Sequence, residues 1–390
     1  MYKQLTDMIE KLSEKAVLCG LFVLAAAERL IFMFNMVGFS GKVAIIGDSE
    51  RYDAWARAIA DQGLSYYANN LDKPYYWGYA TVVAIFRAIF GFDYPLLIFQ
   101  CLFSALSAVF IYKTAMLIFN SKPAALYSGI IYAMCHQTIY WCHVLYSDSI
   151  GLALEIICIY LFFLQKTQQK KQRVLTIVLL VICALMFMSI RTTSFITVAV
   201  LTAGLFSQLP KKPKKIIGLT VCAVIVGALI YMFANSKGEH GLASRLDYYI
   251  DLFKSGTIVY GGMDIDLPKS HFDSPVFALD IILVVLLRAV CFWGIALPFM
   301  EISEMIMNVI NLVPLFILGF GGLIRAKKQK ISGCVYFAAL IIATNIVQAL
   351  SEVDFAYRYR IPIYPALIIP AGWFLHGLLK KTDKKETESA

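Results

Sequence analysis

The chain has 390 residues, of which 59% are hydrophobic and 16% are charged, and its mean hydropathy is +0.70. A soluble protein of this length has too little interior to bury so many apolar side chains, so lipid must solvate part of its surface. The composition excludes a soluble globular protein and predicts an all-α polytopic membrane protein. The formal net charge of +9 does not indicate a nucleic-acid partner, because the basic runs stand beside apolar segments.

The predicted elements follow from hydropathy along the chain. Residues 1–15 mix charged and apolar residues without an A-x-A cleavage site, which predicts a cytoplasmic amphipathic helix and not a cleaved signal peptide. Ten apolar segments are candidate spans: 16–37, 95–119, 124–142, 147–165, 174–190, 193–208, 216–234, 302–324, 332–350 and 361–379. The segments 77–90 and 277–298 are ambiguous, and the first is shorter than the roughly 17 residues that a span needs.

Positive charges set the predicted topology. If neither ambiguous segment crosses the membrane, every basic run and both termini lie in the cytoplasm, as the positive-inside rule requires. We therefore expect ten spans plus two interfacial or re-entrant segments, in a bundle of about 10–12 helices. The chain is predicted to form a single integral membrane domain, 1–390, with long outer loops at 38–76 and 235–276 and a cytoplasmic tail at 380–390.

The first outer loop contains a predicted amphipathic helix in the sequence GDSERYDAWARAIADQG. Tyr52, Trp55 and Ile59 recur there at helical spacing, and Asp48-Ser49 is typical of a helix N-cap. Asp48 thus lies where a helix end meets the membrane surface. It can be an ordinary cap or a general base, and the two interpretations are compatible.

Further candidate residues lie on the predicted outer side. Asp72 and Lys73 precede a cluster of aromatics that includes Tyr76, and the aromatics are most simply anchors in the headgroup region. Lys73 is a point charge suited to a phosphate. Asp148 begins the fourth span, with Glu155 two turns further along the same helix face. Ionisable groups inside membrane helices tend to face a bundle interior, although Asp148 could also simply cap its helix.

Four arginines lie outside the cytoplasmic face, against the positive-inside rule: Arg191, Arg288, Arg358 and Arg360. Such cations need anionic partners. A lipid-linked phosphate would satisfy them in a bidentate manner, and pairing with outer carboxylates is the alternative for one or two of them.

These motifs resemble, in their order, those of GT-C glycosyltransferases of the protein O-mannosyltransferase and lipid A aminoarabinose transferase type. That group has an acidic residue followed by Arg-Tyr, an acidic-Lys-Pro motif with aromatics, a segment ending in Phe-Gly, a later Asp and a final Arg-Tyr-x-x-Pro. The corresponding residues here are Asp48 with Arg51-Tyr52, Asp72-Lys73-Pro74 with Tyr75-Tyr76-Trp77, Phe90-Gly91, Asp148, and Arg358-Tyr359-Arg360-Ile361-Pro362. The resemblance is good over about residues 1–200, moderate over 350–375 and weak over 210–345.

The resemblance implies a GT-C-like bundle whose conserved-type module is 1–208 and whose variable helices lie in 209–379. It further implies an inverting glycosyltransferase of the plasma membrane, expected to be bacterial, with its active site on the outer face. The donor would be a polyprenyl-phosphate-linked sugar, and the acceptor a cell-envelope glycan, a lipid or a protein. Asp48 would deprotonate the acceptor, and Asp148 would hold the acceptor or the sugar.

The expected substrate-binding residues are Glu50, Arg51, Tyr52, Asp72, Lys73, Tyr76, Arg191, Arg288, Arg358 and Arg360. Lys73 and the arginines would bind the donor phosphate. A frequent Asp-Glu pair of the family is replaced here by Asp48-Ser49, with Glu50 one place later. Asp48 and Glu50 could therefore bind a divalent cation, so metal dependence is open, and no other cofactor is expected.

Two other classes of function compete with this interpretation. A transporter or flippase for a lipid-linked or anionic solute should show inverted repeats and broken helices that meet at the bilayer midplane. The notable charges lie instead at the outer interface, which favours an enzyme. A non-catalytic scaffold that needs a partner subunit is less consistent with the presence of Asp48, Lys73 and Asp148 together.

Overall fold

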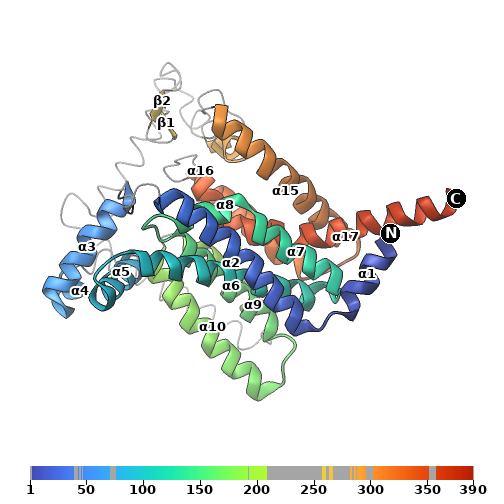
Figure 1. Ribbon diagram of the computed structural model, residues 1–390, viewed down its shortest axis with the longest axis horizontal. Coiled ribbons are helices and arrows are strands. Elements are labelled where there is room, and N and C mark those ends of the chain that lie inside the picture. The colour runs from blue at the N-terminus through green and yellow to red at the C-terminus, as the bar shows by residue number, and fades with distance from the viewer. Residues whose placement is uncertain are drawn as a thin grey trace. The chain divides into compact units, whose positions relative to one another are not determined.

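The computed structural model describes residues 2–38, 43, 45, 47–70, 76–191, 193–208, 257–260, 263–266, 282, 285–286, 288–295, 302–350 and 357–389. The predicted span 216–234, most of the loop 235–276, and both Asp72 and Lys73 lie outside the described residues. Within them the chain is helical apart from one antiparallel hairpin, β1 (Thr257–Tyr260) with β2 (Met263–Asp266) (Figure 1). This confirms the prediction of an all-α membrane fold.

The elements before the hairpin are α1 (Tyr2–Lys11), α2 (Glu14–Gly38), α3 (Asp48–Gln62), α4 (Leu64–Asn69), α5 (Trp77–Phe90), α6 (Tyr94–Phe119), α7 (Lys122–Met134), α8 (His136–Ile139), the 3₁₀ turn η2 (Tyr140–Cys142), α9 (Asp148–Leu164), α10 (Lys170–Ile190) and α11 (Ser194–Ser207). After it come α15 (Ile302–Lys328), α16 (Cys334–Leu350), the 3₁₀ turn η4 (Tyr357–Ile363) and α17 (Tyr364–Ser389). The chain divides into two compact units. The first is Met1–Val198, Ile295–Ile341 and Ile361–Ala390, and the second is Ala199–Gly294 and Ile342–Arg360.

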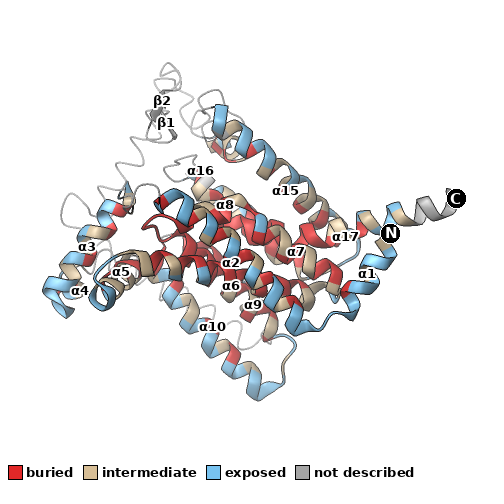
Figure 2. Ribbon diagram, in the orientation of Figure 1, coloured by how far each residue is buried: buried red, intermediate tan, exposed pale blue. Residues whose placement is uncertain are grey.

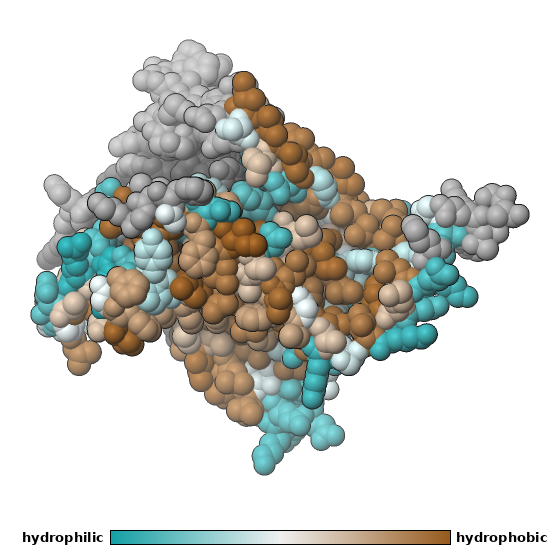
Figure 3. Space-filling view, in the orientation of Figure 1, coloured by the Kyte–Doolittle hydropathy of each residue, from teal (hydrophilic) through white to brown (hydrophobic). Residues whose placement is uncertain are grey.

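Five of the described helices are long and apolar enough to cross a membrane, judged by length and composition: Glu14–Gly38, Tyr94–Phe119, Lys170–Ile190, Met305–Lys328 and Arg358–Asp383. Each coincides with a predicted span. In the first unit, apolar atoms cover the long helices, and polar atoms gather over α1, the start of α10 and α3 (Figure 3). A surface with polar ends and apolar sides is typical of a protein that lipid surrounds.

The core of the first unit is built around α6. This helix contacts α2, α7 and α9, while α17 packs along α7 and α15. Buried residues are concentrated in α6, α7, α9 and α17, whereas α1, α3 and the outer side of α10 are exposed (Figure 2). Apolar residues are spread around α6 and not confined to one face, as expected of a helix that packs against three others.

The predicted helix 124–142 is broken in the structure. Cys135 has an extended backbone (φ −72°, ψ 104°), and the chain continues in the short α8 and η2. Beside the break lies the fully buried Arg29 of α2, which donates hydrogen bonds to the carbonyl of Ala133 (3.2 Å) and to Thr138 Oγ1 (2.9 Å). A guanidinium in the membrane interior needs acceptors, and the end of α7 supplies carbonyls that an unbroken helix would use internally. This role of Arg29 was not predicted from the sequence.

Close packing of α17 on α7 requires glycine at position 372. A methyl group there would lie 2.3 Å from the backbone nitrogen of Ser128, whose hydroxyl donates to the carbonyl of Ile369 at 2.9 Å. We expect Gly372→Ala to force the helices apart and to lower stability by about 1–3 kcal/mol. Titration with a denaturing detergent, followed by circular dichroism, measures this loss.

The matched control is Gly20→Ala on α2. A methyl group at Gly20 would meet nothing within 4 Å, so this variant should be neutral or slightly stabilising. Equal losses in both variants would contradict the close approach at Gly372.

Candidate active site

Asp48 is the first residue of α3, and Gly47 occupies the N-cap position. The prediction that Asp48 caps the helix is therefore wrong by one residue. Gly47 has φ +54°, a left-handed conformation that glycine adopts without strain, and a methyl group there would lie 2.9 Å from the Tyr146 hydroxyl. Asp48 accepts a hydrogen bond from Arg51 and keeps 24% of its side chain exposed. A partly exposed carboxylate thus stands at the positively polarised end of α3.

A hydrogen bond joins α3 to the residue that directly precedes α9. Tyr52 is 2% exposed and donates from its hydroxyl to Ser147 Oγ at 2.9 Å. Ser147 directly precedes Asp148, the first residue of α9. Tyr76, which was predicted to be an interfacial aromatic, lies with its ring centroid 6.2 Å from that of Tyr52. These contacts bring Asp48 and Asp148 to the same end of the first unit.

Asp148 forms a buried ion pair with Arg191, which follows α10. The side chain of Asp148 has no exposed surface, and that of Arg191 is 7% exposed. The side chain of Arg191 lies against Gly151, one turn along α9. A methyl group at position 151 would lie only 2.5 Å from Arg191 Cδ, so glycine leaves the space that this side chain occupies. Further along α9, the buried Glu155 accepts a hydrogen bond from Thr197 Oγ1 at 2.5 Å. For Arg191, the partner is therefore a protein carboxylate, which was the alternative to a lipid phosphate.

Ion pairs that were not predicted from the sequence hold α3 to its neighbours. Arg87, near the end of α5, donates to both oxygens of Asp93 (2.6 and 3.0 Å) and lies 2.6 Å from Asp53 of α3. The signal that could have revealed it was an arginine inside the apolar segment 77–90. The network ties α3, α5 and the start of α6 together and so fixes where Asp48 stands.

The other predicted site residues are distributed as follows. Glu50 and Arg51 are exposed on α3. In the second unit, Arg288 and Arg360 are each 2% exposed, and Arg360 donates to the carbonyl of Gly294 at 2.6 Å. Arg358 is half-buried in η4. Their binding of a donor phosphate stays a prediction.

Across the described ranges, no three His, Cys, Asp or Glu side chains form a group that could hold a metal ion. The carboxylates of Asp48 and Glu50 are suitable ligands for a divalent cation. The remaining ligands would have to come from water, from the substrate or from residues outside the described ranges. Metal dependence through Asp48 and Glu50 therefore stays an open prediction.

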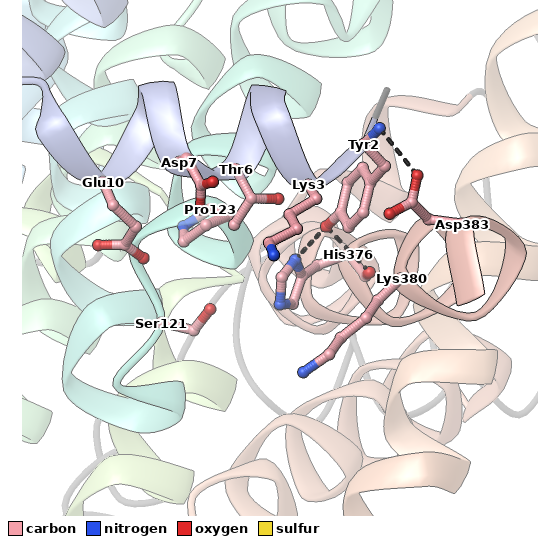
Figure 4. A pocket seen from close by; sticks show the side chains of 10 residues that line it. All are labelled: Tyr2, Lys3, Thr6, Asp7, Glu10, Ser121, Pro123, His376, Lys380 and Asp383. Carbon is pink, nitrogen blue, oxygen red and sulfur yellow. Dashed lines mark hydrogen bonds between the residues drawn. The ribbon is translucent and has the colours of Figure 1, made fainter. Parts of the chain in front are cut away.

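A cavity of about 460 Å³, lined by several charged residues, lies where α1 meets α17, at the opposite end of α2 from α3. Figure 4 shows its charged residues, which are Lys3, Asp7, Glu10, Lys380 and Asp383. The Tyr2 hydroxyl shares a hydrogen bond with His376 Nδ1, and the Tyr2 backbone nitrogen donates to Asp383 at 3.1 Å. Burial raises the pKa of Tyr2 above its usual range. Because three carboxylates accompany the two lysines, the cavity has no excess of positive charge.

Comparison with known proteins bears on the site that contains Asp148. The family described as dolichyl-phosphate-mannose-protein mannosyltransferase matches residues 72–249, a range that begins after Asp48 and includes Asp148 and Arg191. Among curated proteins, none matches the chain. The matched range is a little under half of the chain, and it supports a glycosyltransferase of the GT-C superfamily, while the long apolar helices support an integral membrane protein.

Proposed function

We propose that the protein is an inverting glycosyltransferase that moves a sugar from a polyprenyl-phosphate-linked donor to an acceptor. The acceptor is a cell-envelope glycan, a lipid or a protein, and the reaction takes place at the outer face of a bacterial plasma membrane with both termini in the cytoplasm. The main support is the contact between α3 and α9 through Tyr52 and Ser147. It brings a partly exposed carboxylate, Asp48, to the same end of the bundle as the buried Asp148–Arg191 pair. The matched family is named for a lipid-phosphate sugar donor, which supports the donor class.

In this proposal Asp48 is the general base. Its carboxylate is the more exposed of the two, so an acceptor nucleophile can reach it. The acceptor attacks the anomeric carbon on the face opposite the phosphate and gives its proton to Asp48, while the bond from the anomeric carbon to the phosphate oxygen breaks. Because there is one displacement, a single base suffices and the configuration at the anomeric carbon inverts.

Asp148 and Arg191 have a positioning role in the same proposal. Since Asp148 is fully buried, it acts on substrate through Arg191, whose guanidinium it orients. Departure of the polyprenyl phosphate leaves negative charge that fixed cations stabilise, and Lys73, Arg288, Arg358 and Arg360 are the proposed ligands. Glu50, Arg51, Tyr52, Asp72 and Tyr76 would complete the binding surface for the substrates.

The test is to incubate purified protein with a panel of polyprenyl-phosphate sugars and an acceptor mixture, and to follow release of polyprenyl phosphate. Release with one donor, and a product whose anomeric configuration is inverted by NMR, would support the proposal. A retained configuration would overturn the single-base mechanism. If EDTA abolishes the release of polyprenyl phosphate and Mn²⁺ restores it, this result would support a metal ion bound by Asp48 and Glu50. No release, together with movement of a labelled lipid across liposome bilayers, would favour the transporter or flippase class.

A further inference from the structure

An apolar groove of about 430 Å³ lies where α15 turns into α16, in the first unit. Its floor is formed by the apolar side chains of Leu323, Ile324, Val335 and Ala338. Two of them face outward, because Ile324 is 59% and Val335 is 65% exposed. On helices that are apolar enough to lie in a membrane, this exposure places the groove against lipid.

Two lysines, Lys327 and Lys330, form the rim of this groove, and none of its lining residues in the described part of the chain is a carboxylate. They belong to the last turn of α15 and its cap, where Arg325 and Lys328 add two more cations. Arg325 places its guanidinium 4.6 Å from the centre of the Trp373 ring on α17. The rim thus lies at the end of the bundle where α17 also meets α1. Cations above an apolar floor at a membrane surface match a phosphate headgroup with its acyl chain.

The backbone holds Lys330 in an unusual conformation. The Ile331 nitrogen donates to the carbonyl of Ala326 (2.9 Å), and the Lys330 nitrogen donates to that of Lys327 (3.1 Å). This pair of bonds is a Schellman motif, whose left-handed position is usually filled by glycine. Here it is filled by Lys330, with φ +57°. A lysine at a position that favours glycine is strained, so the turn itself does not explain why Lys330 is present. Its positive charge at the rim of the groove explains its presence better.

We propose that this groove, lined by Leu323, Ile324, Val335, Ala338, Lys327 and Lys330, binds an anionic phospholipid of the surrounding bilayer. The phosphate contacts the two lysines, and an acyl chain lies along the apolar floor. The cavity between α1 and α17 serves as an internal contrast, because its lysines, Lys3 and Lys380, are accompanied by carboxylates. The proposal is independent of the sugar-transfer chemistry.

The experiment places the full-length protein in nanodiscs of dioleoyl phosphatidylglycerol or of dioleoyl phosphatidylcholine and compares the unfolding temperatures. We expect the wild type to unfold at a higher temperature in phosphatidylglycerol, and Lys327→Gln/Lys330→Gln to lose at least half of that shift. Lys3→Gln/Lys380→Gln should keep the full shift. Equal shifts in all three proteins would overturn the proposal, because Lys327 and Lys330 would then have no part in the effect of the lipid. The same loss in both double variants would also overturn it, because that result indicates a general effect of surface charge.

A second variant separates lipid binding from folding. Lys330→Gly relieves the left-handed strain, so in phosphatidylcholine it should be at least as stable as the wild type. In phosphatidylglycerol it should nevertheless show a smaller shift, and native mass spectrometry should find less phosphatidylglycerol retained on it. Undiminished retention would overturn the proposal. So would the same shift produced by inorganic phosphate in phosphatidylcholine, or displacement of the phosphatidylglycerol by an equimolar amount of polyprenyl phosphate.

Discussion

Asp48→Asn is expected to lower the rate of sugar transfer by about 10²–10⁴-fold, because asparagine has the size of aspartate but cannot take the proton of the acceptor. Folding should hardly change. The pair between Asp48 and Arg51 is largely exposed on the arginine side, and such pairs contribute about 0–1 kcal/mol. Release of polyprenyl phosphate by purified protein measures the rate, and the unfolding temperature in detergent measures the stability.

The matched control for this experiment is Asp61→Asn, which makes the same change in the last turn of α3. Asp61 is exposed and lies about three turns from Asp48 on a helix of 15 residues. Its replacement should leave transfer and stability near those of the wild type. Full transfer activity in a normally folded Asp48→Asn protein would exclude Asp48 as the base. Equal losses of transfer activity in both variants would instead indicate that transfer depends on the total charge of α3 and not on the carboxylate of Asp48.

The parts of the fold that could be predicted are those that length and hydropathy determine locally. The long apolar helices around 16–37, 95–119 and 174–190 agree with the structure because a stretch of that length has few alternatives in lipid. The interfacial helix with Tyr52 was predictable from its period. The match of residues 72–249 to the dolichyl-phosphate-mannose-protein mannosyltransferase family agrees with the resemblance that the ordered motifs indicated.

The break after α7 could not be predicted, because its cause lies on another helix. The segment 124–142 is apolar throughout and favours one continuous helix. It is interrupted where Arg29, distant in sequence, takes Ala133 and Thr138 as acceptors. Similarly, the pairing of Asp148 with Arg191 joins residues from different helices. Both residues were identified from the sequence, but Asp148 was expected to cap its helix or to hold the acceptor or the sugar, and Arg191 was expected to bind a lipid-linked phosphate or an outer carboxylate. Long-range pairing depends on packing, which a local pattern does not encode.

Breaking the ion pair between Asp148 and Arg191 should destabilise the protein more than any exposed pair would. Removing one member leaves the other charged, buried and uncompensated, which typically costs about 3–5 kcal/mol. We therefore expect Arg191→Gln and Asp148→Asn each to lower the free energy of unfolding by that amount. Arg57→Gln, which breaks an ion pair with Asp53 whose arginine is 71% exposed, is the surface control and should cost less than about 1 kcal/mol.

The double variant Asp148→Asn/Arg191→Gln decides what the pair does beyond folding. Two neutral amides can hydrogen-bond to each other, so the double variant should lose less stability than either single variant, and the double-mutant cycle should then give a coupling energy of at least about 3 kcal/mol. Additive losses would show that the two side chains do not interact. A double variant that is stable but inactive would indicate that Arg191 binds the substrate and that Asp148 orients Arg191. Neutral amides cannot stabilise a departing phosphate as a guanidinium does. A stable and fully active double variant would restrict the pair to holding α10 against α9, and the cations of the site would then have to be other residues than Arg191.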